Sequence, residues 1–252
     1  MTADFKGKKI WIIGASSGIG EAVARGLAQQ GARLLLSARR EDRLTALAAE
    51  TGGQDILALD IADADAVHAA VDSMSTAGAL PDIVINFAAI YKPMSFDSLD
   101  TSQTTDIIKV NLAGSFYLAA ALVPHFRRLR RGKIVLCGSV AGFVGLPNGQ
   151  PYSATKAGII NLAESLRAEL HGTGVSVQVI NPGFVRTDLT AQNDFEMPAM
   201  IEPSAAAQYI ISGLKGNTFD IHFPKRFTLF MKFLRMLPYG LYFRCMRFLQ
   251  KG

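Results

Sequence analysis

The chain has 252 residues, enough for one large α/β domain. With 49% hydrophobic and 19% charged residues it is not a disordered chain, and Cys137 and Cys245 are too few for a disulfide framework. Seven Lys or Arg and no Asp or Glu follow Asp220, whereas the chain up to that residue carries 19 basic and 21 acidic residues. The net charge of +5 therefore belongs to the C-terminus, and we expect no nucleic-acid-binding surface on the body.

The N-terminal segment MTADFKGKKIWIIGASSG has no apolar h-region followed by a small-residue cleavage site, as a signal peptide would. Together with the scarcity of cysteine, this predicts a cytoplasmic protein. The four histidines are scattered without metal-ligand spacing, so no metal site is expected.

Strand-length apolar runs alternate with helical patterns along the chain. Strands are expected at 8–13, 33–38, 55–60, 82–88, 133–139 and 175–181. Helices are expected at 19–30, through the forties, from about 63, at 101–131 and at 152–170. Because this alternation requires parallel strands joined by right-handed crossovers, the sequence predicts a doubly wound, Rossmann-like α/β domain over residues 1–222, followed by an extension over 223–252.

A glycine-rich turn, GASSGIG, joins the first expected strand to the first expected helix. Glycine at Gly14, Gly18 and Gly20 allows a tight turn and a close approach by a pyrophosphate, and the helix N-terminus offers N–H groups to it. A plain turn is the alternative, but the position in the first strand-helix unit favours a dinucleotide site. The expected contacts are Gly14, Ser16, Ser17, Gly18, Ile19 and Gly20.

The end of the second expected strand, SARR, lies where an adenosine ribose would bind. Arg39 and Arg40 follow Ala38 directly, and no acidic residue precedes Glu41. Since arginine pairs with a 2′-phosphate while an acid accepts from a free 2′-hydroxyl, this favours NADP(H). Arg39 is the main candidate, and Arg40 could equally solvate the start of the next helix.

Tyr152 and Lys156 are four residues apart on an expected helix, so both side chains project from one face. An ammonium near a phenol lowers its pKa, which would bring proton exchange toward neutral pH. Ser139 closes the fifth strand at the edge where such sheets bind ligands, although a serine there is often only a turn former. Asn111 is a poor helix former within a long helix, and its side chain can hold a water or a backbone carbonyl.

The GxxxGxG turn with Asn111, Ser139, Tyr152 and Lys156 resembles the short-chain dehydrogenase/reductase family, over the chain to about Thr187. The resemblance implies an NADP(H)-linked oxidoreductase in which Tyr152 is the general acid in reduction and the base in oxidation. Ser139 would orient the carbonyl, Lys156 would lower the Tyr152 pKa and hold the nicotinamide ribose, and Asn111 would anchor a proton relay.

The same resemblance implies further cofactor contacts. The expected residues are Asp60, Ile61, Asn86, Ala88, Tyr152, Lys156, Pro182, Gly183, Val185 and Thr187. The chain departs from the family pattern at Ile13, Phe87 and Ala89, which puts the usual local hydrogen bonds there in doubt.

The C-terminal extension differs from the seventh strand and Asp-Gly-Gly turn of ketoacyl reductases. Apolar residues recur at helical spacing from Phe227 and again after Gly240, with Lys and Arg between them. Neither run is long enough to cross a bilayer, but a basic amphipathic pair could lie in an anionic membrane interface. A lid over the substrate and a contact with a second subunit remain open as alternatives.

Three functions fit the sequence. The first is an NADPH-dependent carbonyl reductase for an apolar, lipid-like ketone, acting as a dimer or tetramer. The second is an NADP-linked alcohol dehydrogenase working in the oxidative direction. The third is a dinucleotide-sensing or scaffold protein without turnover, against which the intact Tyr152 and Lys156 argue.

Overall fold

The computed structural model describes residues 5–249, and the side chains of residues 5–247. Seven strands form one sheet in the order β3-β2-β1-β4-β5-β6-β7, and all neighbouring pairs are parallel. The strands are β1 (Lys9–Ile13), β2 (Arg33–Ala38), β3 (Asp55–Ala58), β4 (Ile83–Asn86), β5 (Lys133–Cys137), β6 (Ser176–Pro182) and β7 (Asp220–Phe223). This is the predicted doubly wound, Rossmann-like sheet in a single domain.

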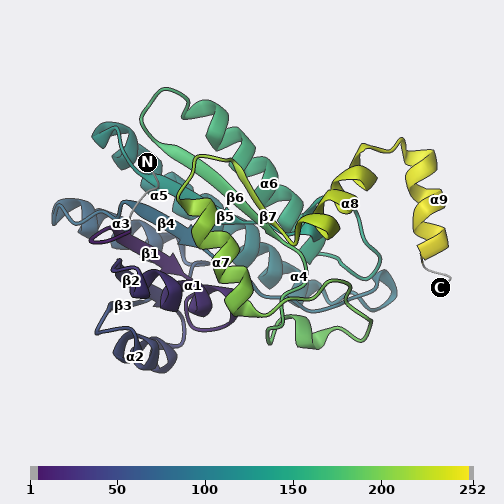
Figure 1. Cartoon of the computed structure of the whole chain (residues 1–252), viewed down its shortest axis with the longest axis horizontal. Coiled ribbons are helices and arrows are strands. Elements are labelled where there is room, and N and C mark those ends of the chain that lie inside the picture. Colours follow the sequence, from purple (N-terminus) through teal and green to yellow (C-terminus); the bar gives the residue numbers. More distant parts are fainter. Residues whose placement is uncertain (1–4, 250–252) are drawn as a thin grey trace.

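Helices cover both faces of the sheet (Figure 1). They are α1 (Gly18–Gln29), α2 (Glu41–Glu50), α3 (Ala64–Thr76), α4 (Thr101–Ile108), α5 (Gly114–Leu129), α6 (Tyr152–Glu169), α7 (Pro203–Leu214), α8 (Lys225–Met236) and α9 (Tyr239–Leu249). Apolar residues of α1, α2 and α7 pack in one core, and those of α3, α5 and α6 pack in the other. The two layers therefore bury both faces of every central strand.

The central strands show why their sequences are almost continuously apolar. In β1, Trp11 and Ile13 face one core while Ile10 and Ile12 face the other. A parallel sheet with helices on both faces needs apolar side chains in both directions, so the polar alternation of a half-exposed strand is absent here. The indole N–H of Trp11 donates to the Ser37 hydroxyl at 2.8 Å inside the core.

The chain reverses its winding direction between β1 and β4. From β1 it moves outward through β2 to β3, and it then crosses back so that β4 pairs with the other side of β1. Such a switch point leaves a crevice at the carboxyl ends of the two strands, where open α/β sheets bind ligands. The glycine turn after β1 lies at this crevice.

The helix expected over 101–131 is divided by a π-helical turn at Lys109–Ala113, which contains Asn111. The extra residue in this turn changes the direction of its side chains, and π turns of this kind are frequent at functional sites. By length and composition, Thr101–Leu129 is also the one described helical stretch that could span a bilayer. Its inward residues Leu118, Leu122 and Phe126 pack in the core beside the sheet.

The sequence analysis missed the last strand. DIHF forms β7, which pairs in parallel with β6, so the sheet continues to Phe223. Four residues with an acid and a histidine give too weak an apolar pattern to be recognised as a strand. The two helices expected beyond it are present as α8 and α9, and residues 250–252 lie outside the described part of the chain.

Replacing Ser37 with alanine should lower the free energy of unfolding by about 1–3 kcal/mol, because the buried N–H of Trp11 loses its acceptor. Trp11 is the only tryptophan, so its fluorescence during denaturant unfolding reports the change. Thr45→Ala is the control, since that exposed hydroxyl binds only a carbonyl of its own helix. Equal stability of Ser37→Ala and wild type would contradict the buried hydrogen bond.

Candidate active site

Two positions of the glycine turn have no room for a Cβ atom. Gly14 has φ +82, and a Cβ there would come within 2.5 Å of the Ala88 backbone nitrogen. A Cβ on Gly20 would overlap the carbonyl oxygen of Gly14. The backbone of β1 therefore lies directly against the turn after β4 and against the first turn of α1, which leaves the turn open to a ligand on its remaining side.

The N-terminus of α1 has free donors facing the crevice. Its N-cap residue Ser17 makes no side-chain capping bond, and the hydroxyls of Ser16 and Ser17 both accept from Arg40 Nη2 at 3.0 Å. The first N–H groups of a helix carry partial positive charge and need acceptors. With Arg40 held beside them, this corner of the cleft fits an anionic group such as a pyrophosphate.

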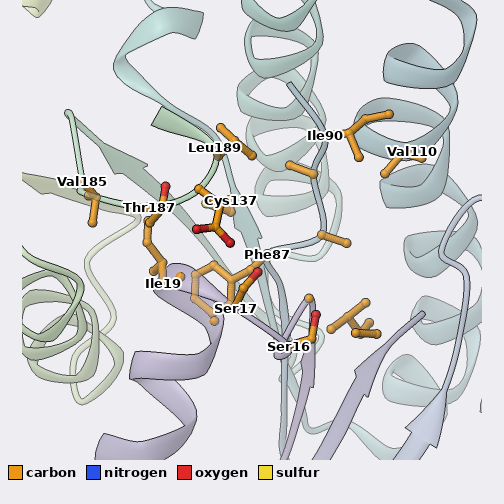
Figure 2. A pocket seen from close by; sticks show the side chains of 18 of the residues that line it. Ser16, Ser17, Ile19, Phe87, Ile90, Val110, Cys137, Val185, Thr187 and Leu189 are labelled. Atoms are coloured by element: carbon orange, nitrogen blue, oxygen red, sulfur yellow. The ribbon is translucent and has the colours of Figure 1, made fainter. Parts of the chain in front are cut away.

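These elements border a cleft of about 410 Å³ at the carboxyl ends of the strands. The expected residues that line it are Gly14, Ser16, Ser17, Gly18, Ile19, Gly20, Arg39, Arg40, Asp60, Ala88, Ser139, Tyr152, Lys156, Pro182, Gly183, Val185 and Thr187. Figure 2 shows Val185 and Thr187 on one side of the cleft and Ile90 and Val110 on the other. The glycine turn and the Tyr152 end are thus parts of one continuous site.

Three side chains from two elements meet at the Tyr152 end. The Lys156 ammonium lies 5.3 Å from the centre of the Tyr152 ring and donates to the Cys137 carbonyl at 2.8 Å. Ser139 caps a short 3-10 turn after β5, where its hydroxyl accepts from the Ala141 N–H at 3.1 Å, and it lines the same cleft as Tyr152. The four-residue spacing on α6 therefore does bring the ammonium beside the phenol, and β5 delivers the serine.

The pKa of Tyr152 differs from the sequence expectation. Burial raises it well above the ordinary tyrosine value, the Cys137 thiol adds to the rise, and the hydrogen bond with Ser139 opposes it. Burial also lowers the pKa of Lys156, because a charged ammonium is disfavoured away from water. In the protein alone, burial therefore decides the direction in which the Tyr152 pKa shifts.

Asn111 acts on the backbone of the loop after β4. Its Nδ2 donates to the Ile90 carbonyl at 2.9 Å and its Oδ1 accepts from the Ile90 N–H at 2.8 Å. This pair of bonds fixes the loop that forms one wall of the cleft. Asn111 was expected to hold either a water or a backbone carbonyl, and in the structure it binds the carbonyl of Ile90. Its side chain is buried and does not line the cleft.

Two other expected residues lie behind the cleft wall. Ile61 is buried against Gly114 at the start of α5. Asn86 is buried too: its Oδ1 accepts from the Ala88 N–H at 3.0 Å and its Nδ2 donates to the Ser115 hydroxyl at 3.1 Å. The local hydrogen bond that was in doubt after the changes at Phe87 and Ala89 is therefore made, and Asn86 supports the backbone that borders the site.

The loop after β6 closes the cleft from the side of α1. The Thr187 side chain lies close to Gly18, where an added Cβ would be 3.0 Å from its methyl group. Thr190 fixes the loop by donating to the Val185 carbonyl at 2.7 Å and accepting from the Thr187 N–H at 3.0 Å. The segment that the sequence placed beside a nicotinamide is thus held against the glycine turn.

The sequence analysis did not find Tyr91. Its ring packs edge-on against Tyr152 with centroids 4.9 Å apart, and its hydroxyl donates to Asn193 Oδ1 at 2.7 Å. It therefore connects the Tyr152 end of the site to the loop after β6. A tyrosine three residues beyond Ala88 was the available signal, but sequence spacing alone cannot show that two rings 61 positions apart touch.

Cys137 was noted only for its lack of a partner. It is unpaired, lines the cleft, and burial raises the pKa of its thiol. Among the described residues no group of three or more His, Cys, Asp or Glu side chains lies close enough to hold a metal ion. At the Tyr152 end of the cleft, the hydroxyl and ammonium groups are those of Ser139, Tyr152 and Lys156.

A glycine turn at the switch point of a parallel sheet, with a serine, a tyrosine and a lysine at the far end of the same cleft, defines a dinucleotide-binding oxidoreductase. The family model for short chain dehydrogenases matches residues 8–197. The chain belongs to the short-chain dehydrogenase family and is an oxidoreductase, which confirms the predicted family.

Individual relatives agree with this family. An uncharacterized oxidoreductase of Myxococcus xanthus is 32% identical over 235 residues, covering 92% of this chain and 93% of that protein. The 3-oxoacyl-(acyl-carrier-protein) reductase FabG of Escherichia coli is 32% identical over 188 residues, covering 74% and 77%. A solved short-chain dehydrogenase from Sphingobium yanoikuyae in complex with NADPH superposes with a TM-score of 0.78 at 31% identity, covering 86% and 88%.

Tyr91→Phe should loosen the loop after β6 while leaving the aromatic contact with Tyr152 in place, because only the hydroxyl bound to Asn193 is lost. One hydrogen bond corresponds to an exchange rate about 2–10 times faster for the amides of residues 190–200, measured by hydrogen exchange. Tyr209→Phe on α7 is the control, since its exposed ring stacks on Phe223 far from this loop. Unchanged exchange at 190–200 in Tyr91→Phe would show that the loop does not depend on this bond.

Proposed function

We propose that the protein is an NADPH-dependent carbonyl reductase that acts on an apolar, lipid-like ketone. The observation that carries the proposal is the meeting of Ser139, Tyr152 and Lys156 in the same cleft as the glycine turn. A dinucleotide-binding scaffold without turnover would have no need for a fully buried lysine beside a half-buried tyrosine, because burying a charged group costs stability.

The residues of the cleft fit NADP(H). The uncapped start of α1, the turn at Gly14 and Arg40 beside them suit the pyrophosphate, and Arg39 at the end of β2 suits a 2′-phosphate. The Sphingobium relative is described in complex with NADPH. Lys156, Pro182, Gly183, Val185 and Thr187 line the part of the cleft assigned to the nicotinamide and its ribose.

The nicotinamide, when bound, supplies the hydride. The side chains of the protein transfer the proton and position the substrate oxygen. Ser139 hydrogen-bonds the oxygen and holds the Tyr152 hydroxyl, Tyr152 donates its proton to that oxygen, and Lys156 stabilises the negative charge that forms on the phenol. Asn111 contributes by fixing the Ile90 backbone at the edge of the site.

The raised pKa of Tyr152 suits the role of a general acid. A group whose pKa is raised keeps its proton at neutral pH, and a general acid must carry a proton before it reacts. Alcohol oxidation would instead need the phenolate, which becomes abundant only as the pH approaches the raised pKa.

Apolar walls support an apolar substrate. Ile90, Val110 and Leu189 line the cleft together with the tyrosine end. A second, mainly apolar groove of about 640 Å³ lies between α9 and the loop that precedes Tyr152, with Leu146, Pro147 and Phe243 in its walls. Gln150, two residues before Tyr152, also lines this groove, which gives room for the hydrocarbon part of a long ketone.

The proposal includes a homo-oligomer, either a dimer or a tetramer, in the cytoplasm. Ile108 on α4 and Phe116 on α5 are exposed apolar side chains on adjoining helices, and such a pair suits a subunit contact. Both Cys137 and Cys245 are unpaired, as they would be in a reducing compartment.

Tyr152→Phe should lower kcat for ketone reduction by at least about 100-fold and change the Kd for NADPH less than about threefold, because only proton transfer is removed. Turnover is followed by the loss of NADPH absorbance with ketones of graded chain length. Tyr117→Phe, a half-buried tyrosine on α5, is the matched control. Near wild-type turnover in Tyr152→Phe would overturn the assignment.

Arg39→Ala should weaken NADPH binding about 10- to 150-fold and leave NADH binding nearly unchanged, which corresponds to about 1.5–3 kcal/mol for one charge-assisted contact. Arg40→Ala is the comparison, since its bonds to Ser16 and Ser17 support the turn for both cofactors. The measurement is isothermal titration with each cofactor. Equal losses of NADPH and NADH binding in Arg39→Ala would refute its role in selectivity.

A further inference from the structure

Helix α8 is apolar on two opposite sides. Thr228, Met231 and Leu234 face the body of the protein and are buried, and Met231 and Leu234 belong to the core beside α6. On the other side Leu229, Phe230, Phe233 and Met236 are exposed. An amphipathic helix normally buries its apolar side chains and exposes polar ones, so the exposed apolar side chains on the outer side of α8 lack a partner among the described residues.

Helix α9 continues the exposed apolar surface. Tyr239, Leu241 and Phe243 are exposed, whereas the Tyr242 hydroxyl donates to the Gly145 carbonyl and anchors the helix to the loop before α6. Figure 1 shows α9 standing away from the sheet beyond α8. Seven of the thirteen exposed large hydrophobic side chains of the described chain therefore fall between residues 229 and 243. We call these seven, Leu229, Phe230, Phe233, Met236, Tyr239, Leu241 and Phe243, the α8–α9 face.

The charges beside this face are all of one sign. Arg226, Arg235, Arg244 and Arg247 are exposed, and the sequence has no acidic residue after Asp220. Lys232 is different, since its ammonium pairs with Asp220 at 2.6 Å and lies over the Phe143 ring. These two contacts hold α8 against the body of the protein. Of the described cations after Asp220, Lys232 thus anchors the helix, Lys225 contacts His222 at 3.2 Å, and the four arginines remain available to an external anion.

We propose that the α8–α9 face docks onto an anionic lipid bilayer. Exposed aromatic and aliphatic side chains flanked by arginines are suited to the boundary between headgroups and hydrocarbon, where the side chains insert and the guanidinium groups bind phosphates. The helices are anchored to the body on their inner sides by Met231, Leu234 and Tyr242, so they lie on the membrane surface and do not span it.

Charge argues against a second copy of the chain as the occupant. A two-fold contact places the same patch of both copies together, which would bring the arginines of each copy against those of the other without any acidic partner from this segment. Charge complementarity therefore favours a negatively charged surface. The docking is independent of the proposed reaction, and its test reads binding and not turnover.

The test is co-sedimentation of the full-length protein with phosphatidylcholine vesicles that contain about one quarter phosphatidylglycerol, at about 50 mM salt. Wild type should sediment with these vesicles and bind pure phosphatidylcholine vesicles at least about tenfold more weakly. Phe230→Ser with Phe233→Ser should weaken binding to the anionic vesicles at least about tenfold, because the inserted rings are lost. Arg226→Gln with Arg235→Gln should weaken it similarly and reduce its salt dependence.

Control variants remove an exposed apolar residue or two positive charges elsewhere on the surface. Leu129→Ser replaces an exposed apolar residue at the end of α5, near the amino edge of the sheet, and Lys8→Gln with Arg43→Gln removes the same charge from the body. Both controls should bind vesicles as wild type does. Circular dichroism and NADPH titration of each variant show that the fold is intact.

Wild type that stays in the supernatant at low salt would overturn the proposal. So would wild-type binding by the Phe230→Ser, Phe233→Ser variant. If that variant instead changes the sedimentation coefficient of the protein in the absence of lipid, the face is a contact between copies and the proposal is wrong. Vesicle binding without turnover on any ketone would leave the docking intact and refute the proposed function alone.

Discussion

The backbone crossing at the carboxyl ends of β1 and β4 constrains everything else in this site. The two strands are neighbours in the sheet, yet the chain leaves them toward opposite sides, so a crevice opens between the turns that follow them. At Gly14 these turns approach so closely that no Cβ fits. Glycine is therefore required at position 14 by the close packing of the two turns, as well as by a ligand.

The second turn at this crossing is stabilised by amide side chains. Asn86 bonds the backbone N–H of Ala88, and Asn111 binds both backbone groups of Ile90 from the π-helical turn. Each buried side-chain amide thus forms hydrogen bonds with backbone groups of this turn, which would otherwise lack partners. The apolar wall of the cleft is held rigidly next to Tyr152, which is the arrangement that positions a substrate carbon near a cofactor.

The sequence predicted the sheet, the glycine turn and the clustering of Ser139, Tyr152 and Lys156, because each depends on local patterns or on strand ends meeting at one edge. The sequence did not predict the features that depend on contacts between residues far apart in the chain. Strand β7 is too short and polar to be recognised, and the contact between Tyr91 and Tyr152 depends on the path of a loop. A helix spacing reveals the cation near Tyr152 but not the burial that raises the Tyr152 pKa in the protein alone.

The central claim is that this cleft reduces a carbonyl carbon with a hydride from NADPH and a proton from Tyr152. The most direct measurement uses NADPH that carries deuterium at the transferred position, an apolar ketone, and mass spectrometry of the alcohol formed. The account predicts one deuterium on the carbinol carbon of the product with wild type, and almost no labelled product with Tyr152→Phe. An alcohol without deuterium, or equal labelled product from both proteins, would contradict it.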